Sequence, residues 1–194
     1  MTIKRISLST GELTLTLAES DFKINDLTEY AARQNPKRGF MFVSKLLAKY
    51  WPSKPKEMLQ MHQYLANAIR HKIRGDSVFV GMAEAAAGLG QGVYEAYLNQ
   101  PINSENLFIH TSRYFLDKSK ALDFLEQHSH ASQFYLYVPD DPKLKRTFIK
   151  AETLVLIDDE ITTGTTFFNL ICAYKIVNPQ LQRIVIVSIL NFVS

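Results

Sequence analysis

The sequence predicts an α/β protein, with a five-stranded, mainly parallel sheet flanked by helices and an N-terminal hood. Five short apolar segments occur after residue 76 and alternate with segments of helical period. These segments are apolar throughout, as expected for strands buried on both faces of a parallel sheet. The first 75 residues differ in composition and period. We therefore expect a hood region over 1–75 and a core over 76–194.

The core segments follow one another as strand and helix. Helices are expected after the first, second and fourth strands, over 83–99, 116–127 and 165–177. The five expected strands cover 77–82, 106–112, 133–139, 153–158 and 183–192.

The sequence of the N-terminal region predicts a hairpin followed by two helices. Alternating residues on either side of Gly11 favour a hairpin. A helix is expected over 24–34, where Asn35 and Pro36 end it. A stronger helix is expected over 55–74, with Pro55 in its first turn and Gly75 after its end. Its apolar residues lie at helical spacing, namely Met58, Met61, Leu65 and Ile69.

The totals exclude several classes of protein. The chain has 194 residues, of which 46% are hydrophobic and 21% charged, as in a globular domain with a real core. A single cysteine, Cys172, allows no internal disulfide, which suits a reducing compartment. The N-terminus lacks an apolar signal segment, and no apolar run approaches a membrane span. We expect a cytoplasmic protein without a membrane partner.

The net charge is only +3, so RNA is not expected as a partner of this chain alone. The chain stops soon after its last expected strand, which predicts a fragment of a longer protein or a separate partner domain.

The segment "VLIDDEITTGTT", residues 155–166, carries the most informative chemistry. A buried strand ends in Asp158 and Asp159, and the loop after it leads into a helix. Ligands of open parallel sheets bind beyond the carboxyl ends of the strands. Unpaired backbone N–H groups at the helix start, threonine hydroxyls and a tight turn at Gly164 would form a phosphate cradle. No Walker loop occurs in the chain.

Two carboxylates beside a phosphate cradle need a partner of their own, since they repel phosphate. A sugar diol supplies one, because carboxylates accept hydrogen bonds from adjacent hydroxyls. Positive charge developing on a sugar ring supplies another. These residues therefore indicate a ribose that carries a 5-phosphate.

The same segment resembles the phosphoribosyl-pyrophosphate (PRPP) motif of type I phosphoribosyltransferases. Together with "NPKRGFMFVSKLLAKYWP", "FVGMAEAAAGLGQGVY", "IHTSRY" and "EQHSHAS", it resembles the orotate-phosphoribosyltransferase-like family of tellurium-resistance-type gene clusters. The similarity covers about residues 12–192. In that family a second domain often follows, and a Pelota-like RNA-binding module is associated.

The resemblance implies the type I phosphoribosyltransferase fold and a magnesium-dependent pentosyltransferase. The enzyme would move ribose 5-phosphate between pyrophosphate and an unidentified nitrogenous base, and it would be a homodimer. The alternative is a non-catalytic PRPP or nucleotide regulator on the same fold, favoured by Ala85, where the family pattern has threonine. A third hypothesis is an RNA-associated accessory domain that works with a partner, which the weak basic charge supports little.

The resemblance also assigns roles to residues. Asp158 and Asp159 would hold the ribose hydroxyls and could contact Mg²⁺. The 5-phosphate would be bound by Thr162, Thr163, Gly164, Thr165 and Thr166. Pyrophosphate would be bound by the loop of Met82, Ala83, Glu84 and Ala85.

Other polar residues allow a functional and a structural interpretation. Arg113 could pair with pyrophosphate or form a surface salt bridge. Lys37 and Arg38 in the hood could reach the diphosphate or the base. Glu126, His128 and His130 lie either in a lid, where they could donate protons, or in a solvated loop. The alternating histidines resemble a zinc site, but the sequence offers no third ligand nearby.

Two further residues of this motif are informative, Thr162 about the choice of base and Glu160 about the end of the strand. Enzymes for 6-oxopurines place an acidic residue where Thr162 stands, so this loop resembles the orotate type. Glu160 stands where most relatives have an apolar residue, and nothing in the sequence explains it.

Overall fold

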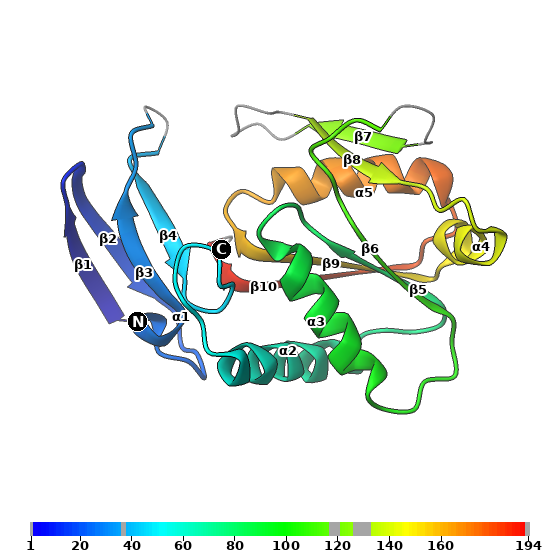
Figure 1. The fold of residues 1–194 in the computed structure, drawn as a ribbon, viewed down its shortest axis with the longest axis horizontal. Helices are drawn as coiled ribbons and strands as arrows, with labels where there is room; N and C mark the ends of the chain where they lie inside the picture. The colour runs from blue at the N-terminus through cyan, green and yellow to red at the C-terminus, as the bar shows by residue number, and fades with distance from the viewer. Residues whose placement is uncertain (1, 36–37, 117–120, 126–132, 193–194) are drawn as a thin grey trace. The chain divides into compact units, whose positions relative to one another are not determined.

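The computed structural model describes residues 2–35, 38–116, 121–125 and 133–192 (Figure 1). The chain divides into two compact units, Met1–Met58 and Leu59–Ser194. Within the described residues, no helix is both long and apolar enough to cross a membrane.

In its described residues before α2 (Pro55–Arg70), the N-terminal unit contains two antiparallel hairpins and one short helix. The first hairpin, β1 (Thr2–Leu8) with β2 (Gly11–Leu17), confirms the prediction around Gly11, which turns the chain at φ +135°. The second pairs β3 (Thr28–Ala32) with β4 (Phe40–Ser44).

The predicted helix over 24–34 is wrong for most of its length. Only α1 (Ile24–Leu27) is helical, and the chain then becomes β3. The reason is tertiary: the ring of Tyr30 packs edge-on against Phe42 of β4, 5.6 Å between centroids. The Thr28 hydroxyl also donates to the Val43 carbonyl. Pairing with β4, a strand that the sequence did not predict, overrides a weak helical pattern.

The C-terminal unit is built on a parallel sheet of four strands in the order β10-β9-β5-β6. The sheet confirms the predicted α/β class and four of the five predicted core strands, with one strand fewer than expected. The four strands are β5 (Ser77–Gly81), β6 (Asn106–His110), β9 (Thr153–Ile161) and β10 (Arg183–Asn191).

The fifth expected strand forms, but outside the sheet. It is β8 (Gln133–Tyr137), which pairs antiparallel with β7 (Ala121–Leu125). Among the residues that the structure describes, an isolated bridge between Ser112 and Tyr135 is its one backbone link to the end of β6. The predicted helix over 116–127 is therefore wrong where it is described: β7 packs Phe124 against Phe134 of β8, with stacked rings 5.5 Å apart.

Helices cover both faces of the sheet (Figure 1). On one side lie α2 (Pro55–Arg70) and α3 (Ala86–Leu98). On the other lie α4 (Pro142–Lys150), which the sequence analysis did not predict, and α5 (Thr165–Val177), which has its predicted bounds. The hairpin β7–β8 lies over α5.

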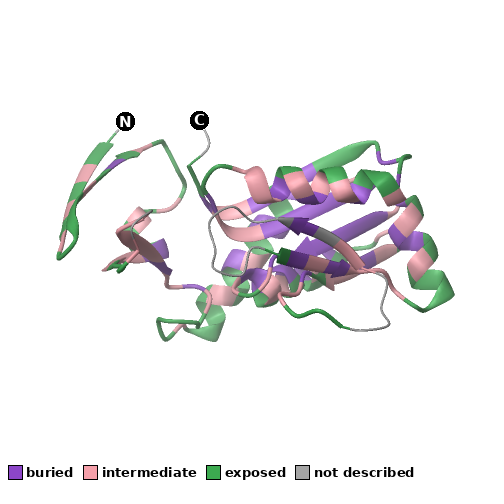
Figure 2. Ribbon diagram, turned by 90° about the horizontal axis from the view of Figure 1, so that it is seen from above, coloured by how far each residue is buried: buried purple, intermediate pink, exposed green. Residues whose placement is uncertain are grey.

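The centre of the sheet is the core of this unit (Figure 2). Every residue of β5 is buried, as are the first five residues of β9. Helix α5 contributes Phe167, Leu170 and Tyr174, and the Tyr174 hydroxyl donates to the Phe148 carbonyl of α4. Continuous apolar runs thus fill a core between two helical layers, as predicted.

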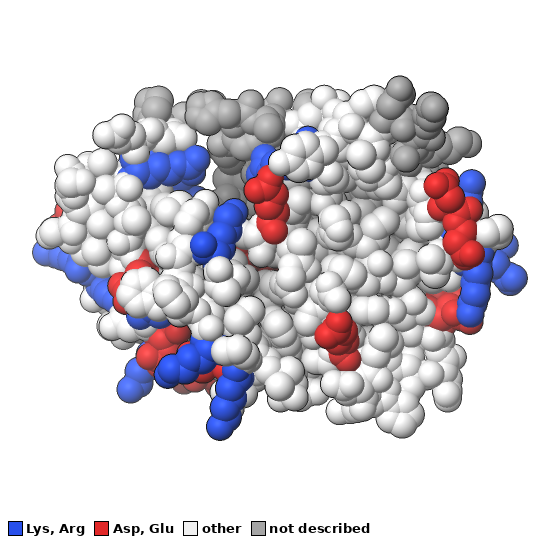
Figure 3. All heavy atoms as spheres, in the orientation of Figure 1, with Lys and Arg blue, Asp and Glu red and all other residues white. Residues whose placement is uncertain are grey.

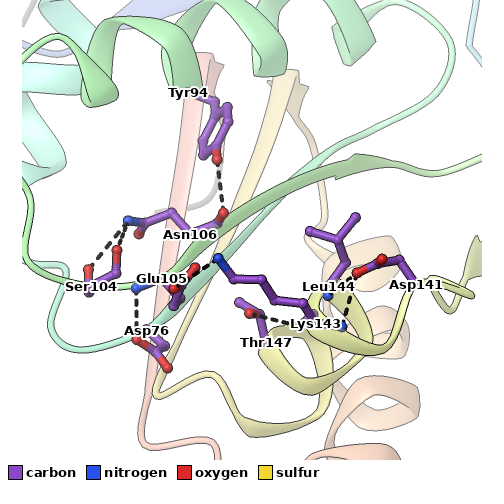
Figure 4. A network of polar contacts seen from close by, with 9 residues as sticks. All are labelled: Asp76, Tyr94, Ser104, Glu105, Asn106, Asp141, Lys143, Leu144 and Thr147. Atoms are coloured by element: carbon purple, nitrogen blue, oxygen red, sulfur yellow. Dashed lines mark hydrogen bonds and ion pairs between the residues drawn. The ribbon is translucent and has the colours of Figure 1, made fainter.

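A polar network closes the amino ends of the strands (Figure 4). The Glu105 amide donates to Asp76 at 2.9 Å, and Lys143 pairs with Glu105 at 3.2 Å. Asp141 caps the start of α4 by accepting two backbone N–H groups. The amino ends are occupied by these contacts, and the candidate site lies at the opposite ends of the strands.

Candidate active site

The two central strands, β5 and β9, lie side by side, but the chain leaves them in opposite directions. After β5 it passes through α3 to β6, and after β9 it passes through α5 to β10. Because α3 and α5 cover opposite faces, the loops after β5 and β9 diverge. This is a topological switch point, where open parallel sheets bind ligands. The loops concerned, 82–85 and 162–164, are those in which the sequence predicted binding residues.

Asp158 and Asp159 lie where the burial of β9 ends. The strand is buried from Thr153 to Ile157, and both aspartates are half-buried. The Asp159 amide donates to the Asp158 carboxylate at 2.9 Å. β5 pairs with β9 only as far as Ile157, so the aspartates follow the last residue of that pairing. This location leaves their carboxyl groups at the switch point.

Two neighbouring carboxylates at this strand end act on Asp158. Burial raises the pKa of Asp158 well above its usual value, and the neighbouring Asp159 raises it further. Glu160, which the sequence left unexplained, adds a smaller rise in the same pKa. A carboxyl group held in this way gains from a hydroxyl donor or a cation placed against it.

The threonine loop turns directly into α5. Gly164 is its N-cap residue with φ 74°, the left-handed region that favours glycine. The hydroxyls of Thr163 and Thr165 lie 3.0 Å apart, and no side chain caps the helix. In the described chain the amides of Thr166 and Phe167 have no acceptor. These open N–H groups at a helix start suit an anion.

The loop after β5 is tied to both neighbouring strands. The Met82 amide donates to the Ile157 carbonyl at 2.9 Å, and the Ala83 amide donates to the Thr111 hydroxyl at 2.7 Å. The peptide bond between Ala83 and Glu84 is cis. Of the four predicted pyrophosphate-binding residues, two therefore have their amides occupied, while Glu84 and Ala85 have no acceptor among the described residues.

Helix α3, which follows this loop, packs closely against strand β5. A Cβ atom on Gly90 would lie 2.8 Å from the Gly81 Cα, so the helix and the strand approach backbone to backbone. The N-cap residue Ala85 provides no side-chain cap, which leaves the first turn of α3 open.

Sequence reasoning missed Thr111. It is fully buried directly after β6, and its hydroxyl holds the loop that follows β5. The signal was a hydroxyl residue at the carboxyl end of a predicted strand, next to the strand that carries the loop.

The remaining predicted residues are distributed differently. Arg113 is half-buried after β6, with its guanidinium 4.4 Å from the centre of the Phe134 ring. Arg38 belongs to the N-terminal unit and lies over the rings of Phe40 and Phe42. Outside the described residues are Lys37, Glu126, His128 and His130.

Comparison with known proteins identifies the class. A family model described as phosphoribosyl transferase matches residues 27–194, and the chain belongs to this family. Members of this family transfer a phosphoribosyl group, which makes the family one of pentosyl transferases. No curated protein matches the chain.

Solved structures with the same fold include three adenine phosphoribosyltransferases. That of Rhodothermus marinus has a TM-score of 0.55 at 10% identity and covers 87% of this chain and 96% of its own. That of Saccharomyces cerevisiae, solved with an imino-altritol bisphosphate and adenine, has a TM-score of 0.52 at 11% identity over 85% and 84%. That of Leishmania tarentolae has a TM-score of 0.51 at 15% identity over 87% and 72%. At these identities the likeness concerns the fold alone, which confirms the predicted type I phosphoribosyltransferase fold.

The family implies magnesium, and the side chains at the switch point can be compared with what that ion needs. Among the described residues, no three His, Cys, Asp or Glu side chains come together as a metal cage. Mg²⁺ usually takes one or two carboxylates, substrate phosphates and several waters. Asp158 and Asp159 supply carboxylates of that kind. The donor set fits an ion held jointly with the substrate.

Proposed function

We propose that the chain transfers ribose 5-phosphate between PRPP and a nitrogenous base, releasing or taking up pyrophosphate. The observation that carries this proposal is the position of two loops at the switch point, one directly after β5 and one directly after the neighbouring strand β9. One loop offers open amides at Glu84 and Ala85. The other follows two half-buried aspartates and offers hydroxyls and open amides at the start of α5.

Each loop suits one part of PRPP. The threonine loop, Thr162 to Thr166 with Gly164, would hold the 5-phosphate through N–H groups and hydroxyls. Asp158 and Asp159 would accept hydrogen bonds from the two ribose hydroxyls. The amides of Glu84 and Ala85 would hold the pyrophosphate, within the predicted loop that begins at Met82.

The carboxylates also suit the chemistry. When bound, Mg²⁺ would neutralise pyrophosphate charge, and Asp158 and Asp159 would be its ligands from this chain. As the bond to pyrophosphate breaks, positive charge develops on the ribose ring, and the same carboxylates stabilise it. Arg113 would pair with the departing pyrophosphate. Protons would come from the predicted lid residues Glu126, His128 and His130.

The proposal extends to the hood, the subfamily, the oligomer and the location of the protein. Lys37 and Arg38 of the hood, residues 1–75, would contact the base or the diphosphate, and the core would be residues 76–194. The resemblance to the orotate-type family of tellurium-resistance gene clusters, a homodimer and a cytoplasmic location belong to the same proposal. Thr162 supports an acceptor other than a 6-oxopurine.

Calorimetry with PRPP and Mg²⁺ tests the binding. The double variant Asp158→Asn with Asp159→Asn is expected to lose PRPP binding, while Asp140→Asn, an exposed aspartate just before α4, binds as the unchanged protein does. Equal PRPP affinity in all three proteins would remove the assignment. Release of pyrophosphate is then measured over a panel of nucleobases.

The second candidate is a non-catalytic PRPP or nucleotide regulator with the same site. Ala85 favours it, because the loop lacks the hydroxyl that the family pattern has at this position. If the chain binds PRPP but releases no pyrophosphate from it in the presence of any base, the result supports the regulator. Release with one base would exclude it.

A further inference from the structure

The segment between β4 and α2 forms a closed loop in the N-terminal unit. The Ser53 hydroxyl donates to the Lys45 carbonyl at 2.5 Å and accepts from the Ala48 amide at 3.0 Å. Leu46, near the start of the loop, is buried, with 6% of its surface exposed. These contacts hold the backbone in one shape, so the side chains at the tip are presented from a fixed base.

Two aromatic residues at the tip point to solvent. Tyr50 is 64% exposed and Trp51 is 43% exposed, although large aromatic side chains are usually covered. Each has a lysine beside its ring: the Lys49 ammonium lies 5.2 Å from the Tyr50 ring centre, and the Lys45 ammonium 5.3 Å from that of Trp51. The loop therefore presents aromatic surface together with positive charge.

The surrounding sequence carries charge of one sign only. Residues 30–56 contain no Asp or Glu and seven basic residues, Arg33, Lys37, Arg38, Lys45, Lys49, Lys54 and Lys56. Lys45 and Lys54 pair with acids outside this range, Glu29 and Glu57. Among the described residues, Lys49 and Lys56 have no acidic partner.

The whole-chain charge conceals this distribution. Residues 1–58 hold ten basic and six acidic residues, a net +4, whereas residues 59–194 hold twelve and thirteen, a net −1. Figure 3 shows Lys and Arg gathered over the N-terminal unit. The +3 total, from which RNA was not expected as a partner, averages a basic unit with a slightly acidic one.

We propose that this loop, residues 45–56, binds single-stranded nucleic acid. Bases would stack on Tyr50 and Trp51, and Lys49 and Lys56 would neutralise phosphates along the strand. Aromatic rings interleaved with lysines are what a strand without fixed sequence requires, because every base has a face to stack and every nucleotide carries a charge. The inference does not depend on the proposed transfer reaction.

A lipid surface fits the loop less well. Membrane association needs a sizeable apolar area to insert, and a few lysines add only weak attraction to anionic lipid. Here Leu46 is turned inward and Leu47 is half-buried, so the loop offers two aromatic side chains and little else that is apolar.

Trp51 is the only tryptophan of the chain, so its fluorescence reports on this loop alone. The full chain is titrated with 15-nucleotide oligouridylate and oligothymidylate at two salt concentrations. We expect quenching of Trp51 on binding, and affinity that falls as salt rises, by about 0.7 in log K per log salt for each neutralised phosphate. Binding of either strand supports the proposal, and their ratio tells whether RNA or DNA is preferred.

Variants test whether the loop is responsible, with binding followed by the anisotropy of a labelled oligonucleotide. Tyr50→Ala and Trp51→Ala are each expected to weaken binding by about 5- to 150-fold, the usual effect of removing one stacked base, whereas Trp51→Phe retains a ring and binds. Lys49→Gln with Lys56→Gln lowers the salt slope by about 1.4. Tyr114→Ala and Lys175→Gln, at exposed positions of the other unit, are matched controls without effect.

Three results would overturn the proposal. One is no binding of either oligonucleotide at low salt. Another is affinity that is unchanged in Tyr50→Ala and in Trp51→Ala, with thermal melts showing both variants folded. The third is a blue shift of Trp51 with vesicles of phosphatidylcholine and phosphatidylserine but no response to oligonucleotides, which would assign the loop to lipid.

Discussion

The amide of Ala83 donates a hydrogen bond to the buried hydroxyl of Thr111 across 2.7 Å. Thr111 in turn donates its own amide to the Gly81 carbonyl at 3.0 Å. The end of β6 thus holds both the last residue of β5 and the loop that follows it. This contact fixes the peptide groups just before the open amides of Glu84 and Ala85, and it links a buried residue to the proposed pyrophosphate site.

Replacing Thr111 with valine tests that link. Valine has the same shape but no acceptor, so the Ala83 amide loses its partner at a cost of about 1–3 kcal/mol in unfolding free energy. We expect PRPP affinity to fall about tenfold as the loop loosens. Thr111→Ser retains the hydroxyl, so its unfolding free energy and its PRPP affinity should stay unchanged. Urea unfolding and calorimetry measure them. Thr147→Val, which removes a buried hydroxyl of α4, is the control that should leave PRPP binding unchanged.

Gly164 allows a test of the turn into α5. Its φ of 74° disfavours any residue with a Cβ, although no atom lies within 4 Å of the position that a Cβ would take. We expect Gly164→Ala to cost about 1–2 kcal/mol through the backbone alone, with weaker PRPP binding, and Gly164→Asn to cost less. Gly88→Ala in α3 meets nothing within 4 Å either and, with ordinary helical φ, should stabilise by up to about 1 kcal/mol. Similar melting temperatures for Gly164→Ala and Gly88→Ala would refute this account.

Asp158→Asn is expected to stabilise the free protein while it removes the proposed ribose contact. The pKa of Asp158 is raised, so the folded chain holds this proton more tightly than the unfolded chain does. Stability therefore falls as pH rises from the usual carboxyl range through the raised pKa of the folded protein. Asparagine does not ionise and escapes that fall.

The gain of Asp158→Asn should be absent in acid and reach on the order of 1 kcal/mol at neutral or higher pH. Urea unfolding at several pH values measures it. Asp140→Asn, at an exposed position, should change stability by less than about 0.5 kcal/mol throughout. A loss of stability in Asp158→Asn that grows with pH would mean that the carboxylate is favoured in the fold.

Gly90→Ala probes the contact between α3 and β5. The new methyl group would lie 2.8 Å from the Gly81 Cα and 3.0 Å from the Phe108 ring, so helix and strand must separate. We expect a loss of about 1–3 kcal/mol, as usual for overpacking, together with weaker PRPP binding because the 82–85 loop moves with the helix start. Gly88→Ala in the same helix is again the control. A crystal structure of Gly90→Ala with unchanged helix position would contradict this expectation.

Elements with a strong local pattern were predictable. The four sheet strands are continuous apolar runs, and α5 begins after a glycine and carries its buried residues at helical spacing. Residues 24–34 and 116–127 have weaker patterns. Within their described parts, Thr28–Ala32 and Ala121–Leu125 became strands, because each found a partner strand in a hairpin. The sequence did not predict helix α4, because its residues are mostly polar and only two of them are buried in the core.

By itself the sequence determined the α/β class, the two aspartates at a strand end and the threonine loop, because these depend on local period and turn chemistry. Only the tertiary structure decided that β8 leaves the sheet to pair with β7, and that Thr111 holds the 82–85 loop. It also decided which amides remain open, since Met82 and Ala83 use theirs on neighbouring strands. The two contacts of the 82–85 loop join residues 28 and 75 positions apart, Ala83 with Thr111 and Met82 with Ile157. No periodicity along the chain encodes which strand will lie beside which.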